Sequence, residues 1–166
     1  VTITEPAVLT ASAATTNVSC NGGNDGTASL TISGGTTSSG NYTENWFGAN
    51  PNSLSAGTYS YEVTDSLGCT YSGSVTITEP AVLTASAATT NVSCNGGNDG
   101  TATVNISGGT QTYTIHAFGQ TQALLGLTSF TTPLPVPAGS YPYFVSDGNG
   151  CQTPIDTIVI TQPPVL

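Results

Sequence analysis

The sequence contains a long internal repeat. Residues 1–28 read VTITEPAVLTASAATTNVSCNGGNDGTA and recur unchanged as residues 75–102. The beginning of this repeat occurs a third time in a less similar form: IVITQPPVL at residues 158–166 resembles VTITEPAVL at residues 1–9. Self-similarity at a fixed period indicates an array in which each repeat is one structural unit. The sequence therefore predicts two related domains that form part of a longer array.

The repeat also predicts where these domains begin and end. Pro cannot donate to a sheet ladder, so the Pro that follows each VTIT segment suits a strand end. We expect residues 1–6 to be the last strand of a preceding repeat and residues 7–80 to be the first domain. Residues 81–163 form the second domain, with an insertion near residues 120–137, and residues 164–166 begin the next repeat. This leaves almost no linker, which predicts stiffly joined neighbours.

Apolar and polar residues alternate along several segments, which predicts half-buried antiparallel strands. Gly, Asn and Asp residues between these segments suit tight turns. The inward-facing residues are expected to include Trp46 and most tyrosines. We predict an all-β fold of tandem immunoglobulin-like β-sandwich domains. The alternating residues are Ala28, Leu30 and Ile32; Ala102, Val104 and Ile106; Tyr59, Tyr61 and Val63; Tyr141, Tyr143 and Val145; Val75 and Ile77.

The insertion in the second domain is rich in leucine and also contains Phe130. One interpretation is an extra hairpin or loop that packs on its own domain. The other is an exposed apolar contact for a neighbour or a ligand.

The charge balance excludes several classes of function. The chain has nine acidic residues, no Lys or Arg, and a net charge of −9. Nucleic-acid binding needs cations for the phosphates, and docking to anionic lipid needs them for the headgroups. No apolar run is long enough to cross a membrane. We therefore expect neither nucleic acid nor membrane insertion among the partners.

The four cysteines fall as one pair in each repeat. An even count at repeated positions is typical of a disulfide framework. Repetition favours the pairs Cys20–Cys69 and Cys94–Cys151, one disulfide in each domain. Each bond would stabilise its domain by about 4 kcal/mol and would indicate an oxidising compartment. Zinc is the alternative, but the sequence has no CxxC and a single histidine.

Catalysis and metal binding find little support in the sequence. His116 is the only histidine, and its counterpart in the first domain is Asn45, so a repeated catalytic site would lack its base. We predict no enzyme activity and no cofactor. Asp25 and Asp99 lie in Gly-rich turns that could offer oxygen ligands to calcium, but each turn has one carboxylate, and turn formation explains the residues as well.

Several spaced elements together resemble the SprB repeat. They are Cys20–Gly26, Gly34–Thr36, Tyr42 to Trp46, Ala56–Asp65, Gly68-Cys69 and Ile77–Pro80. The second domain repeats most of them as far as Cys151. It departs from the pattern at Ala117, where the Trp would be, and by its insertion.

The resemblance implies a cell-surface adhesin of the Bacteroidota that is exported by the type IX secretion system. The founding member of the family is a very large filamentous adhesin that moves along the cell during gliding. We therefore expect a stiff extracellular stalk whose partners are neighbouring repeats and an external surface or polysaccharide. The resemblance also suggests O-linked glycosylation, because Asp65-Ser66-Leu67 and Asp156-Thr157-Ile158 fit the signal of such glycoproteins. The candidate acceptors are Ser66 and Thr157.

Two alternative functions stay open. An array of carbohydrate-binding modules would carry a strip of surface aromatic residues in both domains. A self-assembling fibre would use the strand Val1–Thr4 to complete the sheet of a neighbour.

Overall fold

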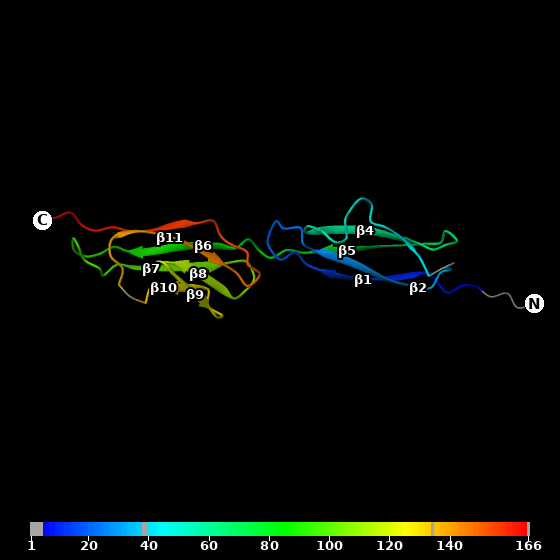
Figure 1. Ribbon diagram of the computed structural model, residues 1–166, viewed down its shortest axis with the longest axis horizontal. Coiled ribbons are helices and arrows are strands. Elements are labelled where there is room, and N and C mark those ends of the chain that lie inside the picture. The colour runs from blue at the N-terminus through cyan, green and yellow to red at the C-terminus, as the bar shows by residue number, and fades with distance from the viewer. Residues whose placement is uncertain (1–4, 38–39, 134, 166) are drawn as a thin grey trace, which may run out of the picture. The chain divides into compact units, whose positions relative to one another are not determined.

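The computed structural model describes residues 5–37, 40–133 and 135–165. The chain forms two compact units, unit 1 (Val1–Glu79) and unit 2 (Pro80–Leu166). All regular elements of the described residues are strands (Figure 1), which confirms the all-β prediction. The described part of the chain contains no helix with the length and apolarity needed to span a membrane.

Unit 1 consists of two small antiparallel sheets. One sheet pairs β1 with β2, the other has the order β3-β4-β5, and a bridge between Gly26 and Leu54 connects the two. Its strands are β1 (Thr10–Thr16), β2 (Thr27–Ser33), β3 (Thr43–Asn45), β4 (Gly57–Thr64) and β5 (Thr70–Ile77). The core of unit 1 consists of Leu9, Val18, Ala28, Trp46, Leu54, Tyr61, Val63, Val75 and Ile77.

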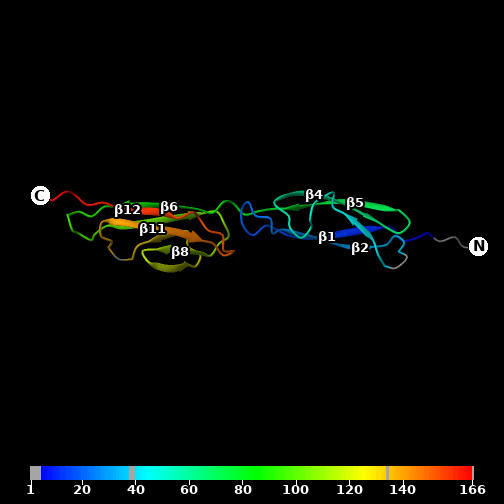
Figure 2. The same ribbon diagram turned by 45° about the horizontal axis from the view of Figure 1, so that its top comes forward.

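Unit 2 has a larger pair of sheets, with the orders β10-β7-β6 and β12-β11-β8-β9. Side chains from both sheets form one core, so the sheets pack face to face, as the two views in Figures 1 and 2 also show. The strands are β6 (Thr84–Thr90), β7 (Thr101–Ser107), β8 (Tyr113–Ala117), β9 (Gln120–Leu124), β10 (Ser129–Thr131), β11 (Gly139–Ser146) and β12 (Asp156–Ile160).

The period-2 patterns predict the buried faces well. Tyr61 and Val63 on β4 are buried, as are Tyr143 and Val145 on β11. Trp46 is 7% exposed, and the centroid of its ring lies 5.4 Å from that of Tyr61. The prediction that Trp46 belongs to the core is therefore confirmed. Alternation succeeds here because each strand has one face on the core and one in solvent.

The insertion of unit 2 supplies two edge strands. β9 extends one sheet beside β8, and β10 extends the other beside β7. Leu124 is 2% exposed within the core, whereas Leu125 and Leu127 are 78% and 57% exposed. The interpretation that the insertion packs on its own unit is confirmed; Leu125 and Leu127 are exposed, and their contact with a neighbour or a ligand stays a prediction.

The insertion and the loss of the Trp are linked. Trp46 fills the core of unit 1 at the edge where β3 ends, and Ala117 takes that place in unit 2. Phe130 from the insertion packs against the core of unit 2 and lines the same hollow as Ala117. The insertion therefore contributes an aromatic ring near the position where unit 2 lacks the Trp.

The predicted strands at the two ends of the chain lie partly outside the described residues. This applies to residues 1–4 and to Leu166. Glu5 and Pro6 are described and belong to no strand, and the same is true of residues 164–165.

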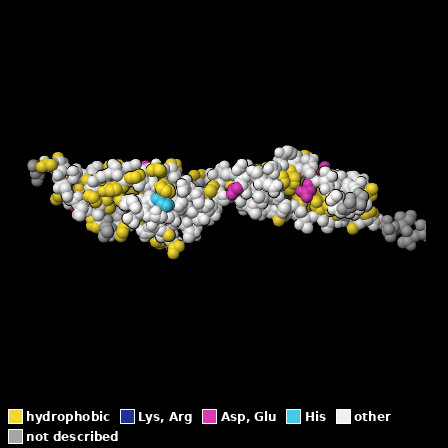
Figure 3. All heavy atoms as spheres, viewed as in Figure 1, with side chains coloured by type: hydrophobic (Ala, Val, Ile, Leu, Met, Phe, Trp, Pro, Cys, Tyr) yellow, Lys and Arg dark blue, Asp and Glu magenta, His cyan; other side chains and the backbone are white. Residues whose placement is uncertain are grey.

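Hydroxyl groups pair across the exposed faces of the sheets. Thr and Ser residues opposite one another on adjacent strands bring their side-chain oxygens within hydrogen-bonding distance, and such cross-strand pairs each contribute roughly 0.2–1 kcal/mol. The face in Figure 3 is accordingly mostly uncharged. The pairs are Thr10–Ser33 (2.9 Å), Thr16–Thr27 (2.7 Å), Thr84–Ser107 (2.8 Å), Thr90–Thr101 (2.7 Å) and Thr103–Thr131 (3.0 Å).

The predicted cysteine pairing within each domain is wrong. Cys20 and Cys151 are disulfide-bonded, whereas Cys69 and Cys94 are exposed free thiols. Three strands, β2, β3 and β4, lie between Cys20 and Cys69 in the sequence. The chain reverses its direction from each of these antiparallel strands to the next. An odd number of strands therefore places the two cysteines at opposite ends of unit 1. The expected stabilisation of each domain by its own disulfide is therefore absent.

Glycine is required where the first segment of each unit crosses the end of its sheet. A Cβ on Gly34, which has a φ of 74°, would lie 1.9 Å from the backbone oxygen of Val8. Gly108 has a φ of 73° and meets Val82 in the same way. The neighbouring amide of Gly35 donates to the backbone oxygen of Ala7 at 2.7 Å. This contact fixes the segment that leads into β1.

We predict that Gly34→Ala destabilises unit 1 more than the matched variant Gly22→Ala. Gly22 has the same sign of φ (75°) but open space at its Cβ position, so it should lose only about 1–2 kcal/mol for the left-handed conformation. Gly34→Ala should lose roughly 1–3 kcal/mol more, because the backbone of Val8 has to move. Urea unfolding followed by the fluorescence of Trp46, the single Trp, measures both. Equal losses would contradict the role of the crossing.

Candidate functional site

The same strained turn follows β3 in unit 1 and β8 in unit 2. Phe47 and Gly48 have φ angles of 52° and 92°, and Phe118 and Gly119 have φ angles of 55° and 69°. Two central residues with positive φ are the signature of a type I′ turn. In unit 1 the turn is closed by a hydrogen bond from the amide of Ala49 to the oxygen of Trp46 (3.1 Å).

Phe is an unfavourable residue for this turn. A bulky side chain in the left-handed region is a genuine outlier, and Asn, Asp or Gly normally takes the place. Phe47 is nevertheless 63% exposed, so burial does not explain its presence. Strain of this kind concentrates at functional positions, which makes the repeated Phe-Gly turn a candidate binding element.

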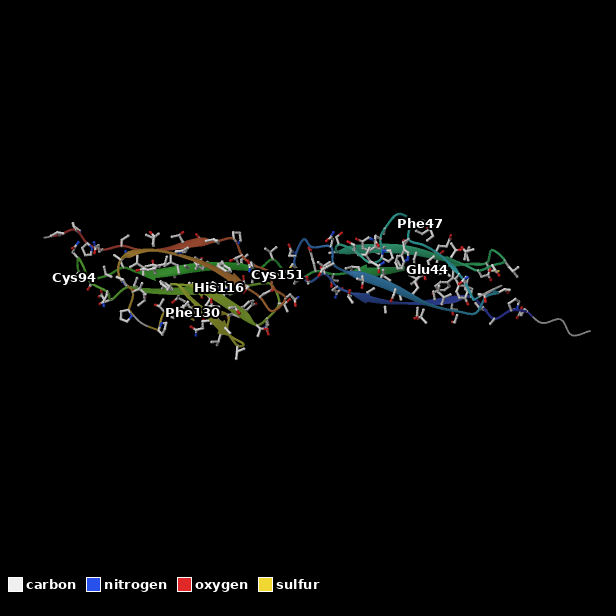
Figure 4. All side chains as sticks on the ribbon, viewed as in Figure 1. Glu44, Phe47, Cys94, His116, Phe130 and Cys151 are labelled. Carbon is white, nitrogen blue, oxygen red and sulfur yellow. The ribbon has the colours of Figure 1, made fainter. Side chains whose placement is uncertain are left out.

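In unit 1 the turn borders a shallow hollow on the surface, which we call the aromatic hollow. Its polar surroundings include the carboxylate of Glu44, which accepts a hydrogen bond from Nε1 of Trp46 at 3.3 Å. Figure 4 shows Phe47 on the turn that projects from unit 1, with Glu44 nearby. The hollow is lined by Trp46, Phe47, Ala49, Thr58, Tyr59 and Ser60.

Unit 2 has its aromatic hollow at the corresponding place. The rings of Phe118 and Tyr141 lie 4.9 Å apart, and the hydroxyl of Tyr141 donates to the oxygen of Pro137 at 2.9 Å. Figure 4 shows the position of Phe130, which comes from the insertion. The full lining is Ala117, Phe118, Gln120, Gln122, Phe130, Thr132, Pro133, Pro135, Val136, Pro137 and Tyr141.

The two hollows share a chemical character. Each offers partly exposed aromatic rings next to hydroxyl, amide or carboxylate groups, and the chain contains no Lys or Arg. Apolar walls with a few polar groups are typical of small-molecule and saccharide sites. Because no side-chain ammonium or guanidinium is present, an anionic ligand would find no such countercharge. The site therefore suits a neutral ligand with both hydroxyl groups and apolar faces.

Two segments of the chain, residues 12–46 and 86–116, match the family model of the SprB repeat. Over these two segments the chain is similar to SprB repeats. SprB repeats occur in cell-surface adhesins, which is consistent with a location outside the cell. Comparison with curated protein sequences gave no match. The two matched segments end at Trp46 and His116, so the Phe-Gly turn of each unit lies directly after its matched segment or one residue beyond it.

The predicted calcium residues close turns in both units. Oδ1 of Asp25 accepts the amide of Ser19 at 3.0 Å, and Oδ1 of Asp99 accepts the amide of Ser93 at 2.9 Å. Hydrogen bonds from these serines hold the pKa of each carboxyl below its usual value of 3.8. The described residues contain no group of three His, Cys, Asp or Glu side chains that could hold a metal ion.

A buried carboxylate organises the turn that carries Ser66. Asp65 is 6% exposed, and its carboxylate accepts the amides of Thr36 (2.8 Å), Leu67 (2.9 Å) and Cys69 (2.8 Å). The bond from Thr36 is the largest cause that lowers the pKa of Asp65 below 3.8.

Both candidate glycosylation residues are exposed. The Ser66 hydroxyl donates to the backbone oxygen of Thr36 at 2.7 Å, so it already has a structural role. Thr157 lies on β12, and its amide donates to Oδ1 of Asp156 at 2.7 Å. Glycosylation at these two positions stays a prediction.

His116 lies on the outer face of the sheet in unit 2. Its ring stacks on Phe144 at 4.2 Å, Nδ1 lies 3.0 Å from Oγ1 of Thr121, and Nε2 lies 3.4 Å from Oγ of Ser146. Hydroxyl groups and an aromatic ring surround the imidazole in these contacts. This is the environment of a packed surface residue.

The most unusual residues of the site are the phenylalanines around the two Phe-Gly turns, and sequence patterns alone point to them only weakly. Neither Phe47 nor Phe118 was a predicted binding residue, and Phe130 was predicted only as part of an insertion that could contact a neighbour or a ligand. The available signal was the Phe-Gly pair, which both repeats keep although the residue before it changes from Trp46 to Ala117. An aromatic residue that persists where Asn would suit the turn better indicates a role other than folding.

We predict that Phe47→Asn changes the free energy of unfolding by less than about 1 kcal/mol. Relief of roughly 1–2 kcal/mol of left-handed strain should offset the loss of the small buried part of the ring. The contrast is Trp46→Ala, which should cost about 3–5 kcal/mol because that ring is buried in the core. Urea unfolding followed by circular dichroism compares the two. A loss of several kcal/mol for Phe47→Asn would show that the ring serves stability instead.

Proposed function

We propose that this chain is a stalk segment of a large extracellular filamentous adhesin that attaches the cell to an external surface. The proposal assigns the SprB repeats a mechanical role, not a catalytic one. It does not depend on gliding, because a repeat is a scaffold that can serve several functions.

The observation that carries the proposal is that hydrogen bonds and burial fix the residues between β5 and β6, each within its own unit. Within unit 1, the backbone oxygen of Thr78 accepts a hydrogen bond from the amide of Val18 at 3.0 Å, and Oε2 of Glu79 accepts one from the amide of Gly22 at 2.6 Å. In unit 2, the backbone oxygen of Ala81 accepts a hydrogen bond from the amide of Gly109, and Leu83 is buried in the core. A connection whose residues are fixed in their own units, with a Pro between them, supports a stiff junction.

We also propose that the units are immunoglobulin-like β-sandwiches. In unit 2 the first, second and fifth strands form one sheet, and the third, fourth, sixth and seventh form the other. This arrangement is similar to the division of strands in immunoglobulin-like folds. Unit 1 has the same order without the two strands of the insertion. An experimental structure of unit 2 with a different strand order would contradict this assignment.

Electron microscopy of the native protein on and off cells tests the stalk. Strands of this length predict an advance of roughly 30–40 Å for each repeat. We expect beaded threads with that spacing that are one chain thick. Compact particles would contradict the proposal, and thick fibres built from many short chains would support self-assembly in its place.

The aromatic hollows favour a second function, the binding of a neutral polysaccharide along the stalk. Both repeats carry the strained Phe-Gly turn next to a half-buried tyrosine, Tyr59 or Tyr141. Rings presented in this way can stack on the apolar faces of sugars, and the neighbouring polar groups can bind sugar hydroxyls. A net charge of −9 favours neutral over acidic polysaccharides.

We predict that a neutral oligosaccharide changes the fluorescence of Trp46, which lines the hollow of unit 1. Cellohexaose and chitohexaose are suitable probes, and polygalacturonic acid is the acidic comparison. A saturable change with a neutral hexasaccharide should disappear in Phe47→Asn, whose fold should be intact. A response that is equal in this variant, or no response to either neutral probe, would exclude the hollow as a binding site for these sugars.

A further inference from the structure

The insertion gives unit 2 a strand that unit 1 lacks. In unit 2, β10 lies along the outer edge of β7 (Figure 1). The counterpart of β7 in unit 1 is β2, and the two strands have the similar sequences TATVNIS and TASLTIS. Among the strands that the structure describes, β2 pairs with β1 alone. Unit 1 therefore has a free sheet edge at the place where unit 2 has an additional strand.

In unit 2, alternate residues of β7 direct their backbone groups toward the insertion. The amide of Ile106 donates to the oxygen of Thr128 at 2.8 Å, and the oxygen of Ala102 accepts the amide of Thr132 at 2.9 Å. Successive residues of a strand direct their hydrogen bonds to opposite sides. The backbone of Val104, which lies midway between Ala102 and Ile106, therefore also faces β10.

The residues at the same positions of β2 are Ala28, Leu30 and Ile32. The amide of Ala28 donates to the oxygen of Pro51 at 2.8 Å, so a loop covers the beginning of this edge. In the described part of the chain, no backbone hydrogen bond outside the ladder of β1 and β2 reaches Leu30 or Ile32. The outward amides and carbonyls of these two residues are thus available to a further strand.

The apolar side chains of β2 are also less covered than those of β7. Val104 and Ile106 are 0% and 5% exposed, whereas Leu30 and Ile32 are only partly buried. In unit 2, Phe130 of β10 packs against the core that contains Val104 and Ile106. A bulky apolar side chain on a strand added to unit 1 would cover Leu30 in the same way.

β2 lacks features that commonly protect a sheet edge. Proteins discourage unwanted strand pairing with charged side chains, Pro or a bulge on the edge strand. β2 contains no charged residue and no Pro, and its register with β1 is continuous over seven residues. In the other sheet of unit 1, the short edge strand β3 carries the charged residue Glu44. The edge of β2 is therefore suited to pairing.

We propose that the free edge of β2 binds an extended segment of a partner protein as an additional antiparallel strand. The bound segment is similar to β10, with a bulky apolar residue between Ser or Thr residues. In this mode the backbone hydrogen bonds supply affinity, and alternate side chains supply specificity. The net charge of −9 disfavours an acidic segment. This role goes beyond that of a stalk, and no residue of β2 lines the aromatic hollow.

The strand pairing of this chain favours a separate partner over a second copy. All strands of the described residues already pair within their own units. A second copy would have to release β10 or another strand from its own sheet before it could donate that strand to β2.

The register of β10 predicts the register of the bound segment. In unit 2, the side-chain oxygens of Thr103 and Thr131 lie 3.0 Å apart on the exposed face. Ser29 takes the place of Thr103 in unit 1 and is also exposed. The apolar residue of the bound segment should therefore lie opposite Leu30, and its two hydroxyl residues should lie opposite Ser29 and Thr31.

Hydrogen exchange of the 166-residue chain, measured by NMR, tests whether the edge is free and binds a strand. The probe is a capped peptide with the sequence of residues 127–131, LTSFT. Without it, the amides of Leu30 and Ile32 should exchange quickly, and those of Val104 and Ile106 slowly. With the peptide at ten times its Kd, exchange at Leu30 and Ile32 should slow about tenfold. Slow exchange before the peptide is added, or no change with it, would overturn the proposal.

A charge pair tests the register. Thr31→Glu places a carboxylate on the exposed face, opposite the expected position of Ser129 of the peptide. A Ser129→Lys peptide should bind this variant about 1.5–5-fold more tightly than it binds the unchanged chain, and a Ser129→Glu peptide should bind more weakly. Ser74→Glu is the matched control, because it adds the same charge at an exposed position of β5 in the other sheet. Equal effects of the two variants would show that the peptide does not pair with β2 in this register.

Sedimentation of the chain alone distinguishes a separate partner from a second copy. Cys69 and Cys94 are first blocked with N-ethylmaleimide, because exposed thiols could link copies covalently. We expect a monomer in which the amides of Leu30 and Ile32 still exchange quickly. A dimer in which these two amides are protected would assign the edge to a second copy and would overturn the proposal of a separate partner.

Discussion

The absence of Lys and Arg constrains every polar contact in this chain. A buried carboxylate cannot find a guanidinium or ammonium partner, so backbone amides must satisfy it. Asp65 shows the solution, because three amides from two loops donate to its oxygens. Asp147 does the same in the second repeat with the amides of Thr110, Asn149 and Cys151. These carboxylates hold together the end of each unit at which the chain enters, and they thereby position the second cysteine.

The two units show how a fixed scaffold can vary at one edge. The strands that begin the two units, β1 and β6, are identical in sequence, and so are the turns after them that hold Cys20 and Cys94. Variation is concentrated between β8 and β11, where an insertion adds an edge strand to each sheet. The Phe-Gly turn lies at this edge in both repeats. The part of the unit that differs is therefore also the part that surrounds the candidate binding site.

Much of the fold could be predicted from the sequence, because alternation is a local signal. The pattern around Tyr61 and Val63 correctly gave both the strand and its buried face. The cysteine pairing failed because repetition shows which residues correspond but not how far apart they lie. Counting strand reversals between Cys20 and Cys69 would have supplied the missing information. The hollow was not predicted for a different reason: Phe is unusual in a turn with positive φ angles, so only the recurrence of the Phe-Gly pair in both units hinted at this geometry.

The hydroxyl pairs on the exposed faces have a consequence for the conditions that this chain tolerates. Surface ion pairs weaken as salt screens their charges and as carboxylates are protonated. The contact between Thr16 and Thr27, and its counterparts along the sheets, joins neutral groups that neither screening nor titration of carboxylates removes. The outer surface is therefore held by contacts that work alike in fresh water and in brine.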